Sequence, residues 1–356
     1  MRAFTYDALP VRVVFGAGTL AQLPDEVARL GLSRILVLST PGQNALGQRA
    51  ADLLGNAAAG LHPHAKMHVP ADVAAAAVAE ARATHADGVV VVGGGSAVGL
   101  GKIVARDLGL PVVAVPTTYA GSEMTPIWGL TENGVKTTAR DPRVLPRSVI
   151  YDPELTLGLP PAVSATSGMN AMAHAVEALY APDANPITST MAEQSIAALA
   201  RGLPRVIAEP TDIDARADAL YGAWLAGVTL GTVTVGLHHK LCHTLGGSFD
   251  LPHADVHTVV LPFAAAYNAA AAPAAMTRVA AALGTDDAPG GLYDLAHNLG
   301  APTSLAALGM KKSDLDRAAD LAVAKPYPNP ATITRDGIRA LLDAAFSGRR
   351  LPPTML

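Results

Sequence analysis

The stretch "VVVVGGGSAVGLGKIVA", residues 89–105, joins a run of valines to a helix-like segment through Gly93, Gly94, Gly95 and Ser96. A continuous valine run is typical of a strand buried on both faces of a parallel sheet. Glycines allow a sharp turn and a close approach of a ligand to the backbone, and a helix that starts there offers free N–H groups. We therefore predict a diphosphate-binding loop, with a plain tight strand-to-helix turn as the alternative.

The rest of the N-terminal part repeats this alternation of strand and helix. Short β-branched runs bounded by Gly or Pro predict strands at 12–16, 34–39, 88–94 and 111–116. Segments with helical spacing lie between them, near 18–30, 43–54, 72–84 and 97–108. Strands that alternate with helices of this length predict a parallel sheet with crossover helices.

The C-terminal part has a different pattern, because strand-like runs largely disappear after residue 161. Alanine- and leucine-rich segments predict helices near 162–181, 186–206, 212–234, 255–269, 272–283, 311–323 and 335–346. We therefore expect an α/β dinucleotide-binding domain of Rossmann-like architecture at 1–155 and an all-helical substrate or catalytic domain at 156–356.

The composition is that of a soluble protein with a large core. Half of the 356 residues are hydrophobic, 16% are charged, and the net charge is −4, which gives no bulk attraction to nucleic acid or to an anionic membrane. The N-terminus lacks the apolar centre of a signal peptide, and no run is long enough to span a bilayer. Cys242 is the single cysteine, so we expect a buried small residue and no internal disulfide. We expect a cytoplasmic location.

A second polar loop, "VPTTYAGSEMTP" at 115–126, follows the next strand. Thr117, Thr118 and Ser122 place hydroxyl groups just beyond the carboxyl end of that strand, where open α/β sheets bind ligands. We predict that these residues contact the cofactor. The alternative is that the hydroxyls only stabilise the turn through their own backbone.

The end of the second predicted strand, "VLSTPGQ", carries Ser39 and Thr40. Dinucleotide sites commonly place an acidic residue there, which binds the adenosine ribose and repels a 2′-phosphate. Both side chains are neutral and no arginine stands nearby. We therefore expect Ser39 to line the cofactor site and the protein to accept either NADH or NADPH.

Two pairs of polar residues are spaced for one face of a helix. The segment "LHHKLCHTLGGSFDLPH" at 237–253 has two histidines four residues apart, and "SGMNAMAHAVEALYA" at 167–181 has an Asn and a His at the same spacing. Polar groups on apolar helices need partners, so we expect five side chains to converge in the helical domain. They are Asn170, His174, His239, His243 and His253.

The spacing of the remaining histidines does not indicate a shared site. His238 adjoins His239 and so lies on a different side of a helix. We interpret the others as surface or packing residues, namely His257, His62, His64 and His68.

The chain resembles the iron-containing alcohol dehydrogenase superfamily over nearly its whole length. The resemblance is carried by "FGAGTL", "GGGS", "PTT…GSE", "YDPELTLGLPP", and the N-xxx-H and H-xxx-H…PH segments. It implies the two-domain architecture shared with dehydroquinate synthase, a nicotinamide cofactor, and a homodimer formed through sheet edges of the N-terminal domain. It also places Lys136 near the nicotinamide, although a surface lysine on a hairpin is an equal alternative.

The resemblance further implies roles for the polar cluster. The family's metal ligands, an Asp and three His, correspond to Asn170, His174, His239 and His253, and its proton-relay histidine corresponds to His243. Two positions depart from the family pattern. Asn170 replaces the carboxylate ligand, and Gly99 replaces the acidic residue of the "GGGSxxD" motif.

These departures resemble the branch of the superfamily that reduces the carbon–carbon double bond of maleylacetate to 3-oxoadipate during the breakdown of aromatic compounds, and that branch is generally regarded as metal-independent. A neutral amide is a weaker ligand than a carboxylate, so we expect no required metal. Asn170, His174, His239 and His253 then bind this dicarboxylate substrate. His243 is the candidate general acid that protonates the enolate, with a structural role as the alternative.

Three other functions remain open at this point. The first is an alcohol or polyol dehydrogenase with a working zinc site, because three histidines can suffice for zinc. The second is a lyase resembling dehydroquinate synthase, against which Asn170 argues. The third is a catalytically silent nucleotide-binding protein, against which His243 beside an intact glycine loop argues.

Overall fold

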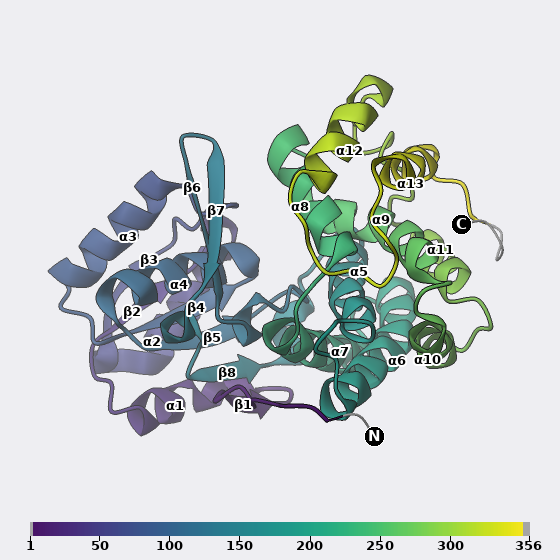
Figure 1. Cartoon of the computed structure of the whole chain (residues 1–356). Coiled ribbons are helices and arrows are strands. Elements are labelled where there is room, and N and C mark those ends of the chain that lie inside the picture. The colour runs from purple at the N-terminus through teal and green to yellow at the C-terminus, as the bar shows by residue number, and fades with distance from the viewer. Residues whose placement is uncertain (1–2, 352–356) are drawn as a thin grey trace. The chain divides into compact units, whose positions relative to one another are not determined.

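The computed structural model describes residues 3–351, which form two compact units (Figure 1). The α/β unit runs from Ala8 to Leu159. The helical unit starts at Pro160 and also contains the described residues that precede Ala8. The division therefore falls slightly later than the boundary at residue 155 that the sequence predicts, because the 3-10 turn Pro153–Thr156 groups with the sheet.

The α/β unit contains a sheet of six parallel strands in the order β1-β8-β5-β4-β2-β3. The strands are β1 (Arg12–Phe15), β2 (Ile35–Leu38), β3 (Ala58–His62), β4 (Gly88–Gly93), β5 (Val112–Pro116) and β8 (Ser148–Tyr151). The four valines of β4 are fully buried between β2 and β5, as a strand covered on both faces requires. The predicted parallel α/β architecture is confirmed.

Four helices of this unit lie where the sequence predicts them. They are α1 (Leu23–Arg29), α2 (Asn44–Leu54), α3 (Ala71–Ala83) and α4 (Gly95–Leu108). The sequence analysis missed strands β3 and β8. It also missed the antiparallel hairpin of β6 (Ile127–Glu132) and β7 (Val135–Arg140), which forms a separate two-stranded sheet. The segment "AAGLH" of β3 is rich in residues that strands disfavour, so its pairing with β2 depends on tertiary context.

The helical unit confirms the all-α prediction for its described residues. Its helices are α5 (Pro161–Ala178), α6 (Pro186–Ala208), α7 (Ile213–Thr232), α8 (Leu237–Phe249), α9 (His253–Asn268), α10 (Pro273–Leu283), α11 (Ala288–Asn298), α12 (Leu315–Val323) and α13 (Arg335–Ser347). The sequence analysis missed α11, which begins "APGG", because Gly and Pro disfavour a helix interior.

Apolar packing fixes the helices that carry the polar cluster. Helix α5 is buried from Ser164 to Ala178. Helices α8 and α9 pack with α12 and α13 around a core that includes Leu241, Val260, Leu315 and Leu341, all fully buried. The polar side chains of α5, α8 and α9 therefore project from well-packed elements, which limits their freedom to move.

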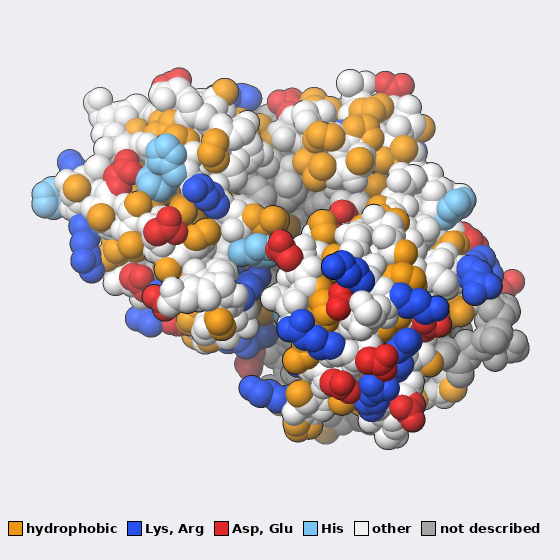
Figure 2. Space-filling view, turned by 90° about the horizontal axis from the view of Figure 1, so that it is seen from above, with side chains coloured by type: hydrophobic (Ala, Val, Ile, Leu, Met, Phe, Trp, Pro, Cys, Tyr) orange, Lys and Arg blue, Asp and Glu red, His pale blue; other side chains and the backbone are white. Residues whose placement is uncertain are grey.

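The visible surface carries charges of both signs. Figure 2 shows Lys and Arg interspersed with Asp and Glu over the face in view. No single described helix is long and apolar enough to cross a membrane, and α7 with α8 meets the length and composition test only as a pair bent by 96°.

Candidate functional site

The glycine loop of the α/β unit has the geometry of a diphosphate cradle. Gly93 has a φ of +146°, a backbone conformation that residues with a Cβ atom rarely adopt. A Cβ on Gly94 would lie 2.8 Å from Thr118, so only glycine fits beside that threonine. Gly94 is also the N-cap of α4, and no side chain caps this helix end. The first N–H groups of α4 are therefore left for a ligand.

The predicted cofactor hydroxyls differ in their surroundings. The Thr118 Oγ1 atom is buried and has no hydrogen-bond partner among the described residues, so a bound group could satisfy it. The Thr117 hydroxyl accepts a hydrogen bond from the amide of Gln43, and the Thr117 N–H donates to the Gly93 carbonyl at 3.2 Å. The sequence analysis missed Gln43, which covers this side of the loop. Thr117 and Thr118 thus lie beside the glycines.

Lys102 has a structural role that the sequence did not reveal. Its ammonium group is fully buried and donates to oxygens of Ser122, Thr125 and Ile127 at 2.6–3.3 Å. Burial lowers the pKa of Lys102 to about 7, and the nearby Glu123 carboxylate opposes this shift. Lys102 ties the loop 122–127 to α4, and the predicted cofactor contact of Ser122 competes with this bond.

The surroundings of Ser39 and Lys136, two other predicted cofactor residues, do not indicate a contact with a ligand. Ser39 is fully buried, and its hydroxyl occupies the space where Gly47 of α2 would carry a Cβ, at 2.8 Å. Thr40, next to it, is half-buried. Lys136 is exposed on β7, where it pairs with Thr131 across the hairpin. The roles of Ser39 and Lys136 toward the cofactor stay predictions.

In the helical unit, α5 presents three polar groups along one face. Asn170, His174 and Glu177 occupy positions i, i+4 and i+7, and each is at most 4% exposed. The Asn170 Oδ1 atom has no hydrogen-bond partner among the described residues. Such a buried, unpaired oxygen at the end of a polar row is a candidate ligand contact.

His239 of α8 joins this row. The Nδ1 atom of His174 lies 2.9 Å from the Nε2 atom of His239, and the two rings are stacked with centroids 5.0 Å apart. The Nδ1 atom of His239 is hydrogen-bonded to Oε2 of Glu177. The sequence analysis missed Glu177. A carboxylate three residues after His174 on an otherwise apolar helix was the available signal.

Glu177 also caps the N-terminus of α8. The backbone N–H of His238 donates to Oε1 of Glu177 at 2.8 Å, and the N–H of Gly236 lies 3.2 Å from both carboxylate oxygens. No side chain at the N-cap position of α8 performs this role. A carboxylate at a helix N-terminus is stabilised by the helix dipole.

The other predicted residues lie around the same imidazoles. The ring of His243 is exposed, 6.1 Å from the ring of His239 and 6.5 Å from that of His253, and it stacks on the latter. His257 approaches His253 with ring centroids 4.5 Å apart. The structure therefore brings together all five predicted residues in one helical unit and adds His257, which the sequence analysis had set aside.

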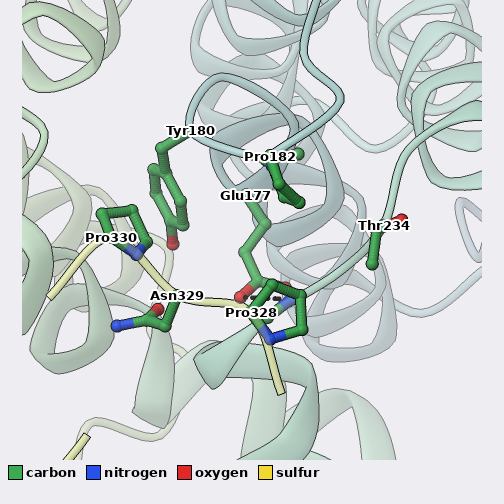
Figure 3. A pocket seen from close by; sticks show the side chains of 9 residues that line it. Glu177, Tyr180, Pro182, Thr234, Pro328, Asn329 and Pro330 are labelled. Atoms are coloured by element: carbon green, nitrogen blue, oxygen red, sulfur yellow. Dashed lines mark hydrogen bonds between the residues drawn. The ribbon is translucent and has the colours of Figure 1, made fainter. Parts of the chain in front are cut away.

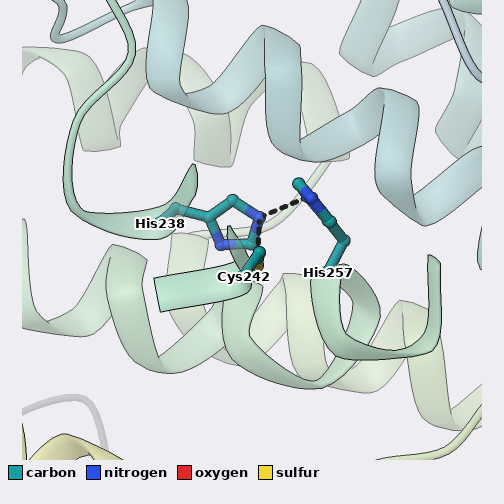
Figure 4. Close-up of side chains that lie close together, drawn as sticks. All are labelled: His238, Cys242 and His257. Atoms are coloured by element: carbon teal, nitrogen blue, oxygen red, sulfur yellow. Dashed lines mark hydrogen bonds between the residues drawn. The ribbon is translucent and has the colours of Figure 1, made fainter. Parts of the chain in front are cut away.

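His238 and His257, whose rings lie 5.5 and 5.1 Å from that of His239, form a buried trio with Cys242 (Figure 4). Their possible ligand atoms all lie within 4.8 Å of one another. However, the Nε2 atom of His238 is already hydrogen-bonded to Nδ1 of His257 at 2.9 Å and lies 3.5 Å from the Cys242 sulfur. Burial lowers the pKa of both histidines well below the usual value and raises the pKa of Cys242 well above it. Cys242 is buried on α8, as expected.

The positions of the family's metal ligands fit a cation poorly. Asn170 offers a neutral amide oxygen, and the ring nitrogens of His174 and His239 are bonded to each other. Among the His, Cys, Asp and Glu residues that the structure describes, His174, His239 and His253 do not form a group with ligand atoms within 4.8 Å. A divalent cation would have to separate the His174–His239 pair and bind without a carboxylate.

A small pocket lies behind Glu177 (Figure 3). It has a volume of about 300 Å³ and is lined by residues that include Glu177, Tyr180, Thr234, Pro328 and Asn329. The carboxylate of Glu177 thus faces the backbone of α8 and His239 in one direction and borders this pocket in another.

Comparison with known proteins identifies related chains. The family model of iron-containing alcohol dehydrogenase matches residues 10–153, and the C-terminal model of the Fe-containing alcohol dehydrogenase family matches residues 164–346. The chain is 59% identical over 350 residues to the maleylacetate reductase of Sphingobium indicum, which covers 98% of this chain and 99% of that protein.

Solved structures of related enzymes have the same fold as this chain. The maleylacetate reductase from Agrobacterium tumefaciens superposes with a TM-score of 0.96 at 55% identity, covering 99% of this chain and 100% of that one. The sulfoacetaldehyde reductase of Bifidobacterium kashiwanohense, solved in complex with NAD⁺, has a TM-score of 0.90 at 25% identity, covering 98% and 100% of the two chains.

Proposed function

The chain belongs to the iron-containing alcohol dehydrogenase family, and we propose that it catalyses the NAD(P)H-dependent reduction of the carbon–carbon double bond of maleylacetate to 3-oxoadipate. The observation that carries this proposal is Asn170, a buried neutral amide at the position of the family's carboxylate ligand, which begins a row of imidazoles. Full-length relatives named maleylacetate reductase support it. The reaction belongs to the breakdown of aromatic compounds.

The glycine loop supplies the binding site for the cofactor. Backbone N–H groups at the start of α4 bind the diphosphate, and the unpaired Thr118 hydroxyl donates to it. When bound, the reduced nicotinamide supplies the hydride that adds to the alkene carbon remote from the ketone. Neutral Thr40 at the end of β2 neither repels nor demands a 2′-phosphate, so both NADH and NADPH are accepted.

The helical unit binds the dianionic substrate. Negative charge develops on the enolate oxygen, and hydrogen-bond donors from Asn170 and His253 stabilise it or hold a carboxylate, while His174 and His239 line the same site. His243 donates a proton to the carbon next to the enolate C–O group, which restores the ketone, and its exposed ring exchanges protons with solvent. Because Asn170 is uncharged, it does not repel a substrate carboxylate as an aspartate would.

We propose that no metal is required, that the protein is cytoplasmic, and that it forms a homodimer through the edges of its parallel sheet. Support for the first point is the donor set at the ligand positions, which lacks a carboxylate. Support for the dimer is that β1 and β3 are edge strands of the sheet.

The test is a direct assay. Purified protein is mixed with NADH and freshly generated maleylacetate, and the absorbance of NADH is followed with and without exhaustive chelation, while metal content is measured in parallel. NADH oxidation that survives chelation is the expected result. Absence of oxidation with maleylacetate and other unsaturated oxo-dicarboxylates would refute the proposal.

A metal-dependent alcohol or polyol dehydrogenase is the second candidate, favoured by the buried His238–Cys242–His257 trio. Loss of all turnover on chelation, restored by one stoichiometric divalent cation, would favour it. In that case the enzyme would also oxidise simple alcohols with NAD⁺.

A further inference from the structure

We propose that Glu177 is a positioning residue for this reaction, which acts through His239 to hold the imidazole row toward the anionic substrate. The inference rests on the proposed function. It gives a role to Glu177, which is not among the residues that we assign to the binding of cofactor or substrate. Glu177 is 1% exposed, so its burial needs strong compensation.

The ring of His239 is hydrogen-bonded at both of its nitrogen atoms. His239 of α8 is held at Nδ1 by Glu177 and at Nε2 by His174, and both of these partners come from α5, three residues apart. Two bonds to opposite sides of the ring fix its rotation and its position. A histidine held by a carboxylate in this way keeps a defined tautomer, because the carboxylate accepts the Nδ1–H.

The consequence reaches His174. His174 is held at Nδ1 by His239, and Asn170 lies one turn earlier on α5. The row therefore runs from carboxylate to imidazole to imidazole. Its negative end, Glu177, is separated from the Asn170 end by two rings.

The distribution of charge makes this arrangement useful. At the Asn170 end the family carboxylate is replaced by an amide, which removes repulsion of a dicarboxylate. At the far end Glu177 retains its carboxylate, covered by His239 and by the N-terminus of α8. Because the carboxylate accepts the Nδ1–H of His239, the Nε2 atom of His239 accepts the Nδ1–H of His174, so the donated hydrogen bonds run along the row toward Glu177 and fix both rings.

A purely structural role for Glu177 would be the capping of α8, so the test must separate capping from positioning. We compare kcat/KM for maleylacetate in four proteins: the natural one, Glu177→Gln, His239→Asn and the double variant. The glutamine is nearly isosteric and still accepts hydrogen bonds from the backbone of α8. We expect Glu177→Gln to lower kcat/KM about 10- to 100-fold, and to have almost no further effect once His239 is absent.

Asp183→Ala is the matched control for the start of α8. Asp183 accepts the Thr234 N–H at 2.9 Å and the Thr234 hydroxyl at 2.7 Å, so its loss disturbs the segment before α8 without removing a bond to Glu177 or His239. It should lower the melting temperature while keeping the kcat/KM of folded protein. Glu177→Asp is the second variant should Glu177→Gln fail to fold. It keeps the charge but withdraws the carboxylate by one methylene, so the same loss is expected.

A spectroscopic measurement decides the contact without reference to turnover. In histidine-labelled protein, the Nδ1–H proton of His239 should give a low-field NMR signal that Glu177→Gln removes and Asp183→Ala preserves. Equal losses of kcat/KM with and without His239, or a signal that persists in Glu177→Gln, would overturn the inference. If the natural protein lacks turnover with maleylacetate, the proposed function fails, while the NMR result still decides whether Glu177 holds His239.

Discussion

Asn170 shows how one atom changes the chemistry of a site. An aspartate oxygen at this position would carry negative charge toward a cation, whereas the amide oxygen is neutral and stays unpaired among the described residues. The neighbouring histidines remain, but two of them bond to each other. The same helices that would hold a metal in the family thus present hydrogen-bonding groups for an anion.

Restoring the carboxylate should reverse this change. We expect Asn170→Asp to bind Zn²⁺ or Fe²⁺ more tightly, because a charged oxygen ligand joins the histidines. We also expect kcat/KM for maleylacetate to fall about tenfold or more, equivalent to about 1.4 kcal/mol, from repulsion of a substrate carboxylate. Metal analysis of dialysed protein and steady-state kinetics check the two effects. Unchanged kinetics and unchanged metal content would contradict the role given to Asn170.

Because His257 and His238 are buried, we predict that the stability of the folded protein falls at acidic pH. Burial and neighbouring histidines depress the pKa of both in the folded protein, so the unfolded chain takes up protons that the folded chain does not. Stability is then fully present above about pH 6.5 and is lost as the pH falls below it, by at most about 1.4 kcal/mol per pH unit for each histidine. Urea unfolding between pH 7.5 and 5 should show a shallower decline for His257→Asn than for the natural protein. Equal slopes would argue against neutral burial of His257.

At the scale of elements, the sequence predicted the strands and turns that depend on residues close together in the chain. The β-branched runs of β4 and β5 and the glycine turn before α4 were evident from sequence, because sterics and burial act on neighbouring residues. Strand β3 and the cap of α8 were not, since β3 depends on pairing with β2 and α8 is capped by Glu177, 61 residues before His238 in the sequence. The same reason concealed Glu177 and Gln43, whose partners lie on other segments.

The tie between α4 and the loop 122–127 gives a prediction at this scale. Lys102→Met keeps the length of the side chain but removes the donor to the carbonyl oxygens of Thr125 and Ile127, whereas the Ser122 carbonyl still accepts from the Thr125 N–H at 3.1 Å. Buried unsatisfied acceptors cost about 1–3 kcal/mol each, so the free energy of unfolding should fall by several kcal/mol, on the order of 3 or more. The KM for NADH should also rise, because the loop borders Thr118. Chemical denaturation and kinetics measure both, and a variant as stable as the natural protein would contradict the structural role of Lys102.

At the scale of the whole molecule, β1 and β3 are the outer strands of the parallel sheet in the described part of the chain, and an edge strand is a template for a second chain. Along β1 the N–H of Arg12 donates inward, to the Arg147 carbonyl at 3.2 Å, so by alternation the N–H of Val13 points outward. We expect light scattering after gel filtration to give the mass of two chains for the natural protein. Val13→Pro removes the outward donor while sparing the inward bonds, and should give the mass of one chain with unchanged circular dichroism. A natural protein with the mass of one chain would refute the dimer, and a Val13→Pro dimer would move the interface away from β1.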